Sequence, residues 1–124
     1  MASSKKRILI VEDEIIVAKS LQCFLEAQGY QVPEPASSGE EALKAVQSAR
    51  PDLILMDVRL KGAIDGIAAA RSINRFCDSP IICLTAFADE RTVARIKQVK
   101  CCGYLCKPIN DAELKSLIAR VLNK

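Results

Sequence analysis

DLILMD at residues 52–57 is a short apolar run that Pro51 introduces and that a carboxylate, Asp57, ends. Continuous apolar runs of this length are typical of strands buried on both faces of a parallel sheet. Similar runs occur at three other places: RILIV at 7–11, IICL at 81–84 and GYLC at 103–106. With a shorter segment at 30–32, which two nearby prolines stop, they predict five strands.

Segments with helical spacing of apolar residues separate these strands. They predict helices at about residues 15–28, 38–49, 66–76, 89–99 and 110–122. Gly29 stands where a helix commonly ends in a left-handed residue, and Asn110 with Glu113 forms a helix-start capping box, as Ser37 or Ser38 does with the glutamates after it. Alternating strands and helices predict an α/β fold with a parallel, doubly wound sheet covered on both faces. We expect a single domain over residues 1–124, with its core at about 6–122.

Composition limits the chemistry of the chain. Its 124 residues include six cysteines but no histidine, and 18 Lys+Arg against 15 Asp+Glu give a net charge of +3. Catalysis by Ser-His-Asp or Cys-His groups and histidine-ligated metals are therefore excluded. The small charge, without a dense basic run, indicates no nucleic-acid binding, and no apolar stretch approaches the roughly 18 residues of a membrane span. We expect a cytoplasmic protein with reduced cysteines, of which Cys23, Cys77 and Cys83 look like core residues.

Polar residues end the predicted strands. They are Glu12 and Asp13 after the first strand, Asp57 after the third, Thr85 after the fourth and Lys107 after the fifth. In a doubly wound sheet these positions share one edge, where three carboxylates would repel one another unless a cation such as Mg²⁺ lay among them. A lysine and a hydroxyl could then bind the oxygens of a tetrahedral anion, which is the equipment of phosphoryl transfer. Each residue alone has a commoner explanation, such as a helix start, a loop cap or an exposed lysine; the hypothesis depends on the set.

The same residues resemble the receiver domain of two-component response regulators. The resemblance runs from Lys6 to about Leu122, and its motifs are ILIVEDE at 8–14, DLILMDV at 52–58, LTA at 84–86 and GYLCKP at 103–108. It implies the flavodoxin-like fold, with strand order 2-1-3-4-5 and five helices.

The resemblance also implies a role for each site residue. Asp57 would be the phosphoacceptor, with Asp13 a direct Mg²⁺ ligand, Glu12 acting mainly through a metal-bound water, and the backbone carbonyl of Arg59 the third protein ligand. Two further residues complete the implied mechanism: Lys107 would pair with the phosphoryl oxygens, and Thr85 would move to bind them. Tyr104 would be the switch aromatic that turns inward as Thr85 moves, and the Lys107-Pro108 bond would be cis. The domain would be an autocatalytic phosphoacceptor and not a turnover enzyme.

Two departures from the family pattern lie near the acceptor. Many receivers have proline four residues after it, where this chain has Lys61 in the loop RLKGAIDG. Arg59 and Phe87 stand two residues beyond Asp57 and Thr85, and we expect these large side chains to limit the water that hydrolyses the phosphoryl group. The other interpretation, that both are ordinary side chains at the solvent edge, is left open.

A sensor histidine kinase or histidine phosphotransfer protein is the partner that the resemblance implies, because the chain itself lacks the phosphohistidine. The output surface of the family comprises the fourth helix, fifth strand and fifth helix, here near 89–99, 103–106 and 110–122, and could bind an effector or a second copy. From this sequence we expect no DNA-binding or enzymatic output after Leu122. Three alternatives are a flavodoxin-like small-ligand module, a degenerate receiver acting only by interaction, and a haloacid-dehalogenase-type phosphatase, whose D-x-D is missing because Arg59 occupies the second position.

Overall fold

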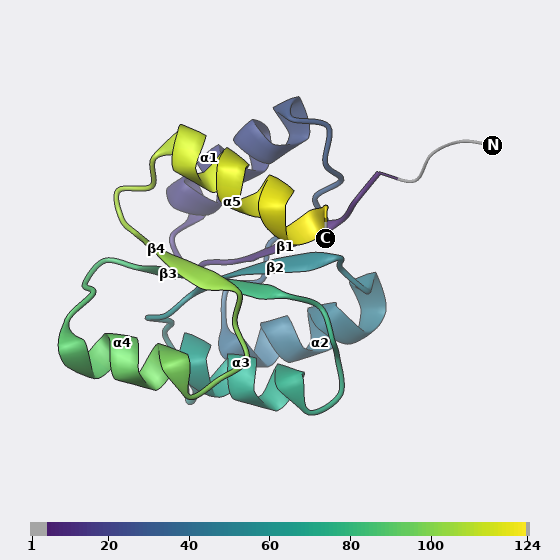
Figure 1. The fold of residues 1–124 in the computed structure, drawn as a ribbon. Helices are drawn as coiled ribbons and strands as arrows, with labels where there is room; N and C mark the ends of the chain where they lie inside the picture. The colour runs from purple at the N-terminus through teal and green to yellow at the C-terminus, as the bar shows by residue number, and fades with distance from the viewer. Residues whose placement is uncertain (1–4, 124) are drawn as a thin grey trace.

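A parallel sheet in the order β1-β2-β3-β4 organises the computed structural model, which describes residues 5–123. The elements are β1 (Ile8–Val11), α1 (Ile15–Ala27), α2 (Gly39–Ala49), β2 (Leu53–Asp57), α3 (Gly66–Asn74), β3 (Ile81–Thr85), α4 (Glu90–Lys97), β4 (Gly103–Cys106) and α5 (Asp111–Leu122). Helices α1 and α5 cover one face of the sheet, and α2, α3 and α4 cover the other (Figure 1). The predicted α/β class, doubly wound sheet and five helices are confirmed.

The prediction of a strand at 30–32 is wrong, so the described residues contain four strands and not five. The segment still runs beside β1, through isolated bridges that pair Arg7 with Gln31 and Val11 with Ala36. Pro33 and Pro35 lie between these bridges and have no N–H to donate, so a continuous ladder cannot form. The segment occupies the expected place of the second strand, next to β1, and the predicted strand order is otherwise retained.

Two apolar clusters fill the space on either side of the sheet. Every residue of β1, β2 and β3 is buried, whereas β4 alternates between half-buried and exposed. Cys83 is buried, but Cys23 is exposed, because α1 turns that position away from the sheet, and its prediction as a core residue is wrong. Over residues 5–123 we find no helix with the length and apolar character needed to cross a membrane.

Helix starts follow the predicted capping residues. The side chain of Ser38 accepts the Glu41 N–H at the start of α2, and Asn110 accepts the Glu113 N–H at the start of α5. Gly29, with φ +95°, follows Gln28, the residue that caps the end of α1, and takes the conformation that favours glycine. The peptide bond before Pro108 is cis, as predicted.

Candidate functional site

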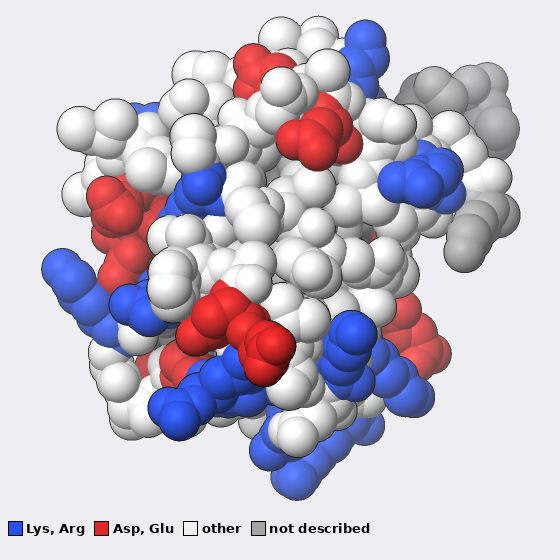
Figure 2. All heavy atoms as spheres, turned by 60° about the vertical axis from the view of Figure 1, so that its left-hand side comes forward, with Lys and Arg blue, Asp and Glu red and all other residues white. Residues whose placement is uncertain are grey.

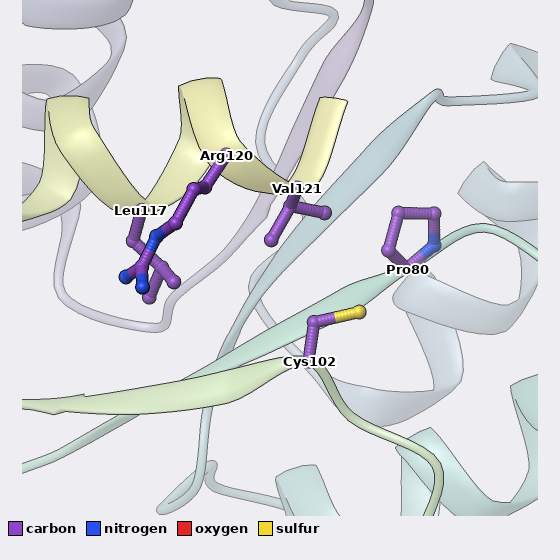
Figure 3. A pocket seen from close by; sticks show the side chains of 5 residues that line it. All are labelled: Pro80, Cys102, Leu117, Arg120 and Val121. Atoms are coloured by element: carbon purple, nitrogen blue, oxygen red, sulfur yellow. The ribbon is translucent and has the colours of Figure 1, made fainter. Parts of the chain in front are cut away.

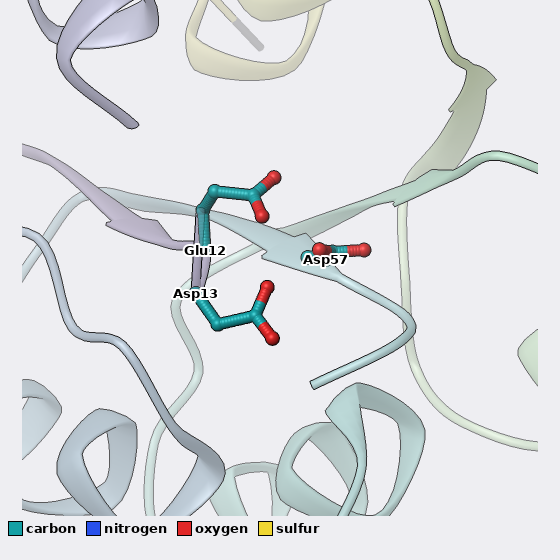
Figure 4. Close-up of side chains that lie close together, drawn as sticks. All are labelled: Glu12, Asp13 and Asp57. Carbon is teal, nitrogen blue, oxygen red and sulfur yellow. The ribbon is translucent and has the colours of Figure 1, made fainter. Parts of the chain in front are cut away.

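Three carboxylates meet at the carboxyl edge of the sheet. Glu12 and Asp13 follow β1 directly, and Asp57 is the last residue of β2, the strand that pairs with β1. Each offers an oxygen within 4.8 Å of the other two (Figure 4). Glu12 is 2% exposed and Asp57 is 4% exposed, so two of the charges are withdrawn from bulk water. The structure thus brings together the three predicted acidic residues.

Lys107 is the cation of this cluster. It follows β4, and its Nζ donates to Glu12 Oε1 at 2.9 Å and to Asp57 Oδ2 at 3.2 Å. Burial disfavours the ammonium charge, but the Glu12 hydrogen bond and the charges of both carboxylates outweigh it and raise the pKa of Lys107. The lysine therefore stays charged and points at the oxygens of Asp57.

One positive charge does not balance three carboxylates. Burial raises the pKa of Asp57 to about 7, and the hydrogen bond and negative charge of Glu12 act in the same direction, against the opposing effect of Lys107. Without a further cation, the Asp57 carboxyl therefore holds a proton up to nearly neutral pH. A divalent cation among these oxygens would favour its ionised form.

Thr85 and Tyr104 lie on the two strands beyond Asp57. Thr85 is 2% exposed, and its hydroxyl donates to the Phe87 carbonyl at 3.0 Å and accepts the Phe87 N–H at 3.1 Å. Tyr104 is 39% exposed on the edge strand β4. Neither side chain has a hydrogen bond to Asp57 among the described residues.

The chain is similar in sequence to a known family of proteins. A sequence model of the response regulator receiver domain matches residues 8–119. The chain belongs to this family. The transcriptional regulatory protein PdtaR of Mycobacterium tuberculosis is 35% identical over 113 residues, which are 91% of this chain and 55% of that protein. BaeR of Escherichia coli, also a transcriptional regulatory protein, is 36% identical over 118 residues, 95% of this chain and 48% of that protein. The chain therefore spans about half the length of these curated relatives.

Solved receiver structures are also similar to this chain. The receiver domain of a modulated diguanylate cyclase from Desulfovibrio desulfuricans G20 matches with a TM-score of 0.89 and 37% identity over 97% of this chain and 95% of that one. The receiver domain of sensor histidine kinase PA1611 from Pseudomonas aeruginosa PAO1 matches with a TM-score of 0.86 and 33% identity, covering 98% and 100% of the two chains. That structure has a magnesium ion coordinated in its active site cleft.

Receiver domains bind Mg²⁺ in an acidic pocket, and the donors of this chain fit that ion. Carboxylate oxygens are the hard ligands that Mg²⁺ prefers, and three of them converge from two adjacent strands. The pKa of Asp57 is raised chiefly because the carboxyl is buried, and Glu12 adds a hydrogen bond and a negative charge that Lys107 offsets only in part.

The β2–α3 loop and the first residue of α3 hold two features that the sequence did not reveal. At Gly66, an added Cβ would overlap the Asp57 carbonyl oxygen, and the Gly66 N–H donates to the Val58 carbonyl at 2.9 Å. Only glycine fits so close to the backbone of Asp57. In the loop, the Lys61 N–H donates to Asp13 Oδ2 at 3.3 Å. The glycine was visible in the sequence, but no spacing rule shows that its Cα packs against Asp57, or where a backbone N–H points.

Proposed function

We propose that Asp57 accepts a phosphoryl group in an Mg²⁺-dependent step of a two-component phosphorelay. The observation that carries the proposal is the buried Asp57 carboxylate, held by Lys107 at 3.2 Å and facing Glu12 and Asp13. Receiver membership supports the reaction class, and the position of these groups supports the residue roles.

The transfer itself is a displacement at phosphorus. An Asp57 oxygen forms the new P–O bond, the P–N bond of the donor's phosphohistidine breaks, and its electron pair returns to the imidazole nitrogen, which takes up a proton. Asp57 must be ionised to attack. Glu12, Asp13, Asp57 itself and the backbone carbonyl of Arg59 would hold Mg²⁺, which when bound supplies positive charge to the phosphoryl oxygens and favours the ionised acceptor.

Lys107 and Thr85 would bind the phosphoryl group once it is on Asp57. The phosphoryl group adds close to two negative charges and three acceptor oxygens. Lys107 Nζ, already directed at Asp57, would pair with one oxygen, and the Thr85 hydroxyl would leave the Phe87 carbonyl to bind another. The exposed Tyr104 ring would then turn inward toward the space that Thr85 leaves. This exchange couples chemistry at β2 to the surface of β4.

A protein donor fits the surroundings of the acceptor. Ile15 is 70% exposed and Ile16 is 84% exposed at the start of α1, directly after the acidic residues. A groove of about 550 Å³ continues from Ile16 between α1 and the β4–α5 loop, and Lys107 forms part of its wall. An apolar surface beside a charged reaction centre supports docking of a histidine kinase or histidine phosphotransfer protein. We also propose that the protein acts in the cytoplasm.

The surface formed by α4, β4 and α5 would transmit the signal by binding a partner. A groove of about 290 Å³ lies between the start of β4 and α5, and its lining residues are Pro80, Cys102, Leu117, Arg120 and Val121 (Figure 3). Lysine and arginine side chains gather on the lower part of the adjoining face, interspersed with acidic ones (Figure 2). This face would bind an effector or a second copy of the chain without direct contact to nucleic acid.

The large side chains at Arg59 and Phe87, both exposed, would slow hydrolysis of the phosphoryl group.

A mimic of the acyl phosphate tests the site. Beryllium fluoride with Mg²⁺ should shift the amide NMR signals of Thr85 and Tyr104 in the unaltered chain and leave them in place in Asp57→Asn. Equal shifts in both chains, or none in the unaltered chain, would contradict the assignment. The family match favours this function over the flavodoxin-like small-ligand module and the phosphatase that the sequence left open.

A further inference from the structure

Two cysteines lie against each other on the side of the sheet that α2, α3 and α4 cover. Cys83 stands in the middle of β3 with no exposed surface, and Cys101 is half-buried in the connection between α4 and β4. Cys83 belongs to the apolar cluster on this side, Cys101 packs against that cluster, and the two thiols are hydrogen-bonded to each other. All six cysteines lie within residues 5–123 and are free thiols. The pair is therefore a reduced dithiol whose sulfur atoms are close together.

The two thiols of this pair differ in how readily they ionise. Cys83 donates its S–H to the Cys101 sulfur and so lowers the pKa of Cys101; burial opposes this effect, and a hydrogen bond from the Gly103 N–H adds to it. The same Cys83–Cys101 hydrogen bond, together with burial, raises the pKa of Cys83. Cys101 is thus the member that becomes the thiolate, and the thiolate is the form of cysteine that attacks oxidants.

The positions of the two residues in the fold suit them to different steps. Cys83 is held within the parallel ladder, where it pairs with Tyr104. Cys101 lies outside the strands, retains some contact with solvent, and has its Sγ 3.7 Å from the Ile96 carbonyl of α4. Disulfide geometry is strict, so the adjustment that an S–S bond needs would fall on the α4–β4 connection and not on β3.

We propose that Cys101 and Cys83 form a peroxide-reactive dithiol site, with Cys101 as the attacking thiolate and Cys83 as the resolving thiol. The Cys101 sulfur attacks one oxygen of hydrogen peroxide; an S–O bond forms, the O–O bond breaks, and the departing hydroxide takes up a proton to become water. The Cys83 sulfur then attacks the sulfenic acid on Cys101; the S–S bond forms, the S–O bond breaks, and the hydroxide leaves with the Cys83 proton as water. The two thiols together lose two electrons, and the peroxide is reduced to water.

The disulfide would join the strand that ends in Thr85 to the residues that lead into Tyr104. Cys83 lies two residues before Thr85, and Cys101 lies three before Tyr104. Oxidation would therefore act on the same part of the sheet as the proposed movement of these two side chains, without using the carboxylate cluster. The dithiol site does not depend on the proposed function, because its chemistry involves no phosphoryl group and no metal.

Mass spectrometry of the unaltered chain after exposure to dilute hydrogen peroxide tests the site without any substitution. We expect the first product to have lost two hydrogen atoms, and fragmentation of the linked peptides, after proteolysis without reductant, to place the bond between Cys83 and Cys101. Dithiothreitol should restore the original mass. A bond between Cys101 and Cys102, oxidation of Cys102 before Cys101, or the absence of any disulfide would overturn the proposal.

Three substitutions separate the roles of the thiols. Cys83→Ala removes the resolving thiol, so the sulfenic acid on Cys101 should form more slowly but persist, and dimedone should label it. Cys101→Ser removes the attacking thiolate and should abolish the disulfide at Cys83. Cys102→Ser is the matched control, because it changes the neighbouring and more exposed thiol, and the Cys83–Cys101 bond should form at the rate of the unaltered chain.

The variants can also contradict these roles. Loss of the disulfide in Cys102→Ser would assign the attack to Cys102, and a Cys83→Ala chain that dimedone never labels at Cys101 would show that Cys101 does not react with the peroxide. The measurement on the unaltered chain remains decisive if a substitution prevents folding.

Discussion

The inner strands β1–β3 and the edge strand β4 differ in how firmly their side chains are held. All residues of β1, β2 and β3 are buried, and these strands carry Glu12, Asp13, Asp57 and Thr85 at or directly after their ends. In β4, burial alternates, and Tyr104 and Cys106 face solvent. Asp57, the proposed acceptor, therefore stands on the closely packed part of the sheet, and Tyr104, the residue proposed to move, stands where little packing must be broken.

If the proposed function holds, this difference would allow one small domain to combine a fixed site with a movable surface. Proximity and electrostatic stabilisation require the carboxylates to be held in place, and a fully buried strand supplies that. A signal requires a side chain with two accessible positions, and an exposed edge strand supplies that. Substitutions in each part test the difference, beginning with the largest expected effect.

Truncating one leucine on each kind of strand compares their packing. Leu55→Ala removes a fully buried side chain from β2 and should lower the free energy of unfolding by about 4 kcal/mol, whereas Leu105→Ala, half-buried on β4, should lower it by about 1 kcal/mol. Denaturant titration followed by circular dichroism measures both. Equal losses would show that β4 is packed as firmly as β2.

Gly66→Ala tests whether the acceptor is held by the loop as well as by its strand. The added Cβ would overlap the Asp57 carbonyl oxygen, so the backbone must shift at the site. We expect a loss of about 3 kcal/mol in the free energy of unfolding, together with loss of phosphorylation. Gly103→Ala on β4 is the control, since its nearest neighbour is the Leu117 side chain at 3.5 Å. Unaltered stability of the Gly66→Ala chain would show that the loop can move away.

The same difference separates what the sequence could predict from what it could not. Continuous apolar runs identified β1, β2 and β3 because burial on both faces leaves a direct pattern, and the polar residue that ended each run belonged to the site. The segment at 30–32 was predicted wrongly because two prolines interrupt its pairing with β1. The Lys61 N–H and the Gly66 contact depend on the path of a loop, and Thr85 gave no sign that its hydroxyl would bond to Phe87.

Asp57→Asn should stabilise the metal-free protein above neutral pH. Burial raises the folded-state pKa of Asp57 to about 7 from an unfolded value near 4, so the folded state binds the extra proton and the stability of the unaltered chain falls as pH rises between these values. Asparagine is neutral at every pH, so the stability of the variant does not fall in this way as pH rises. We expect the variant to gain about 2 kcal/mol at pH 8 and almost nothing at pH 4, as measured by denaturant titration with a chelator. A gain independent of pH would contradict the burial of a charged Asp57.

Arg95→Ala should have the smallest effect, because it removes a contact outside both parts of the sheet. Arg95 of α4 pairs with Asp65 at 2.8 Å, but the two side chains are 45% and 32% exposed. Exposed ion pairs contribute little, so the free energy of unfolding should change by less than about 1 kcal/mol. Thermal unfolding at low and high salt measures it. A larger change would show that this ion pair, and not the apolar residues of α4, fixes the helix.

Covalent labelling of Asp57 tests the central claim most directly. The unaltered chain and Asp57→Asn are incubated with acetyl phosphate, with Mg²⁺ or with a chelator, and analysed by intact mass and peptide mapping. The account predicts one added phosphoryl group, on Asp57, in the unaltered chain with Mg²⁺, and no label in the other three samples. A label on another residue, or equal labelling of Asp57→Asn, would contradict it.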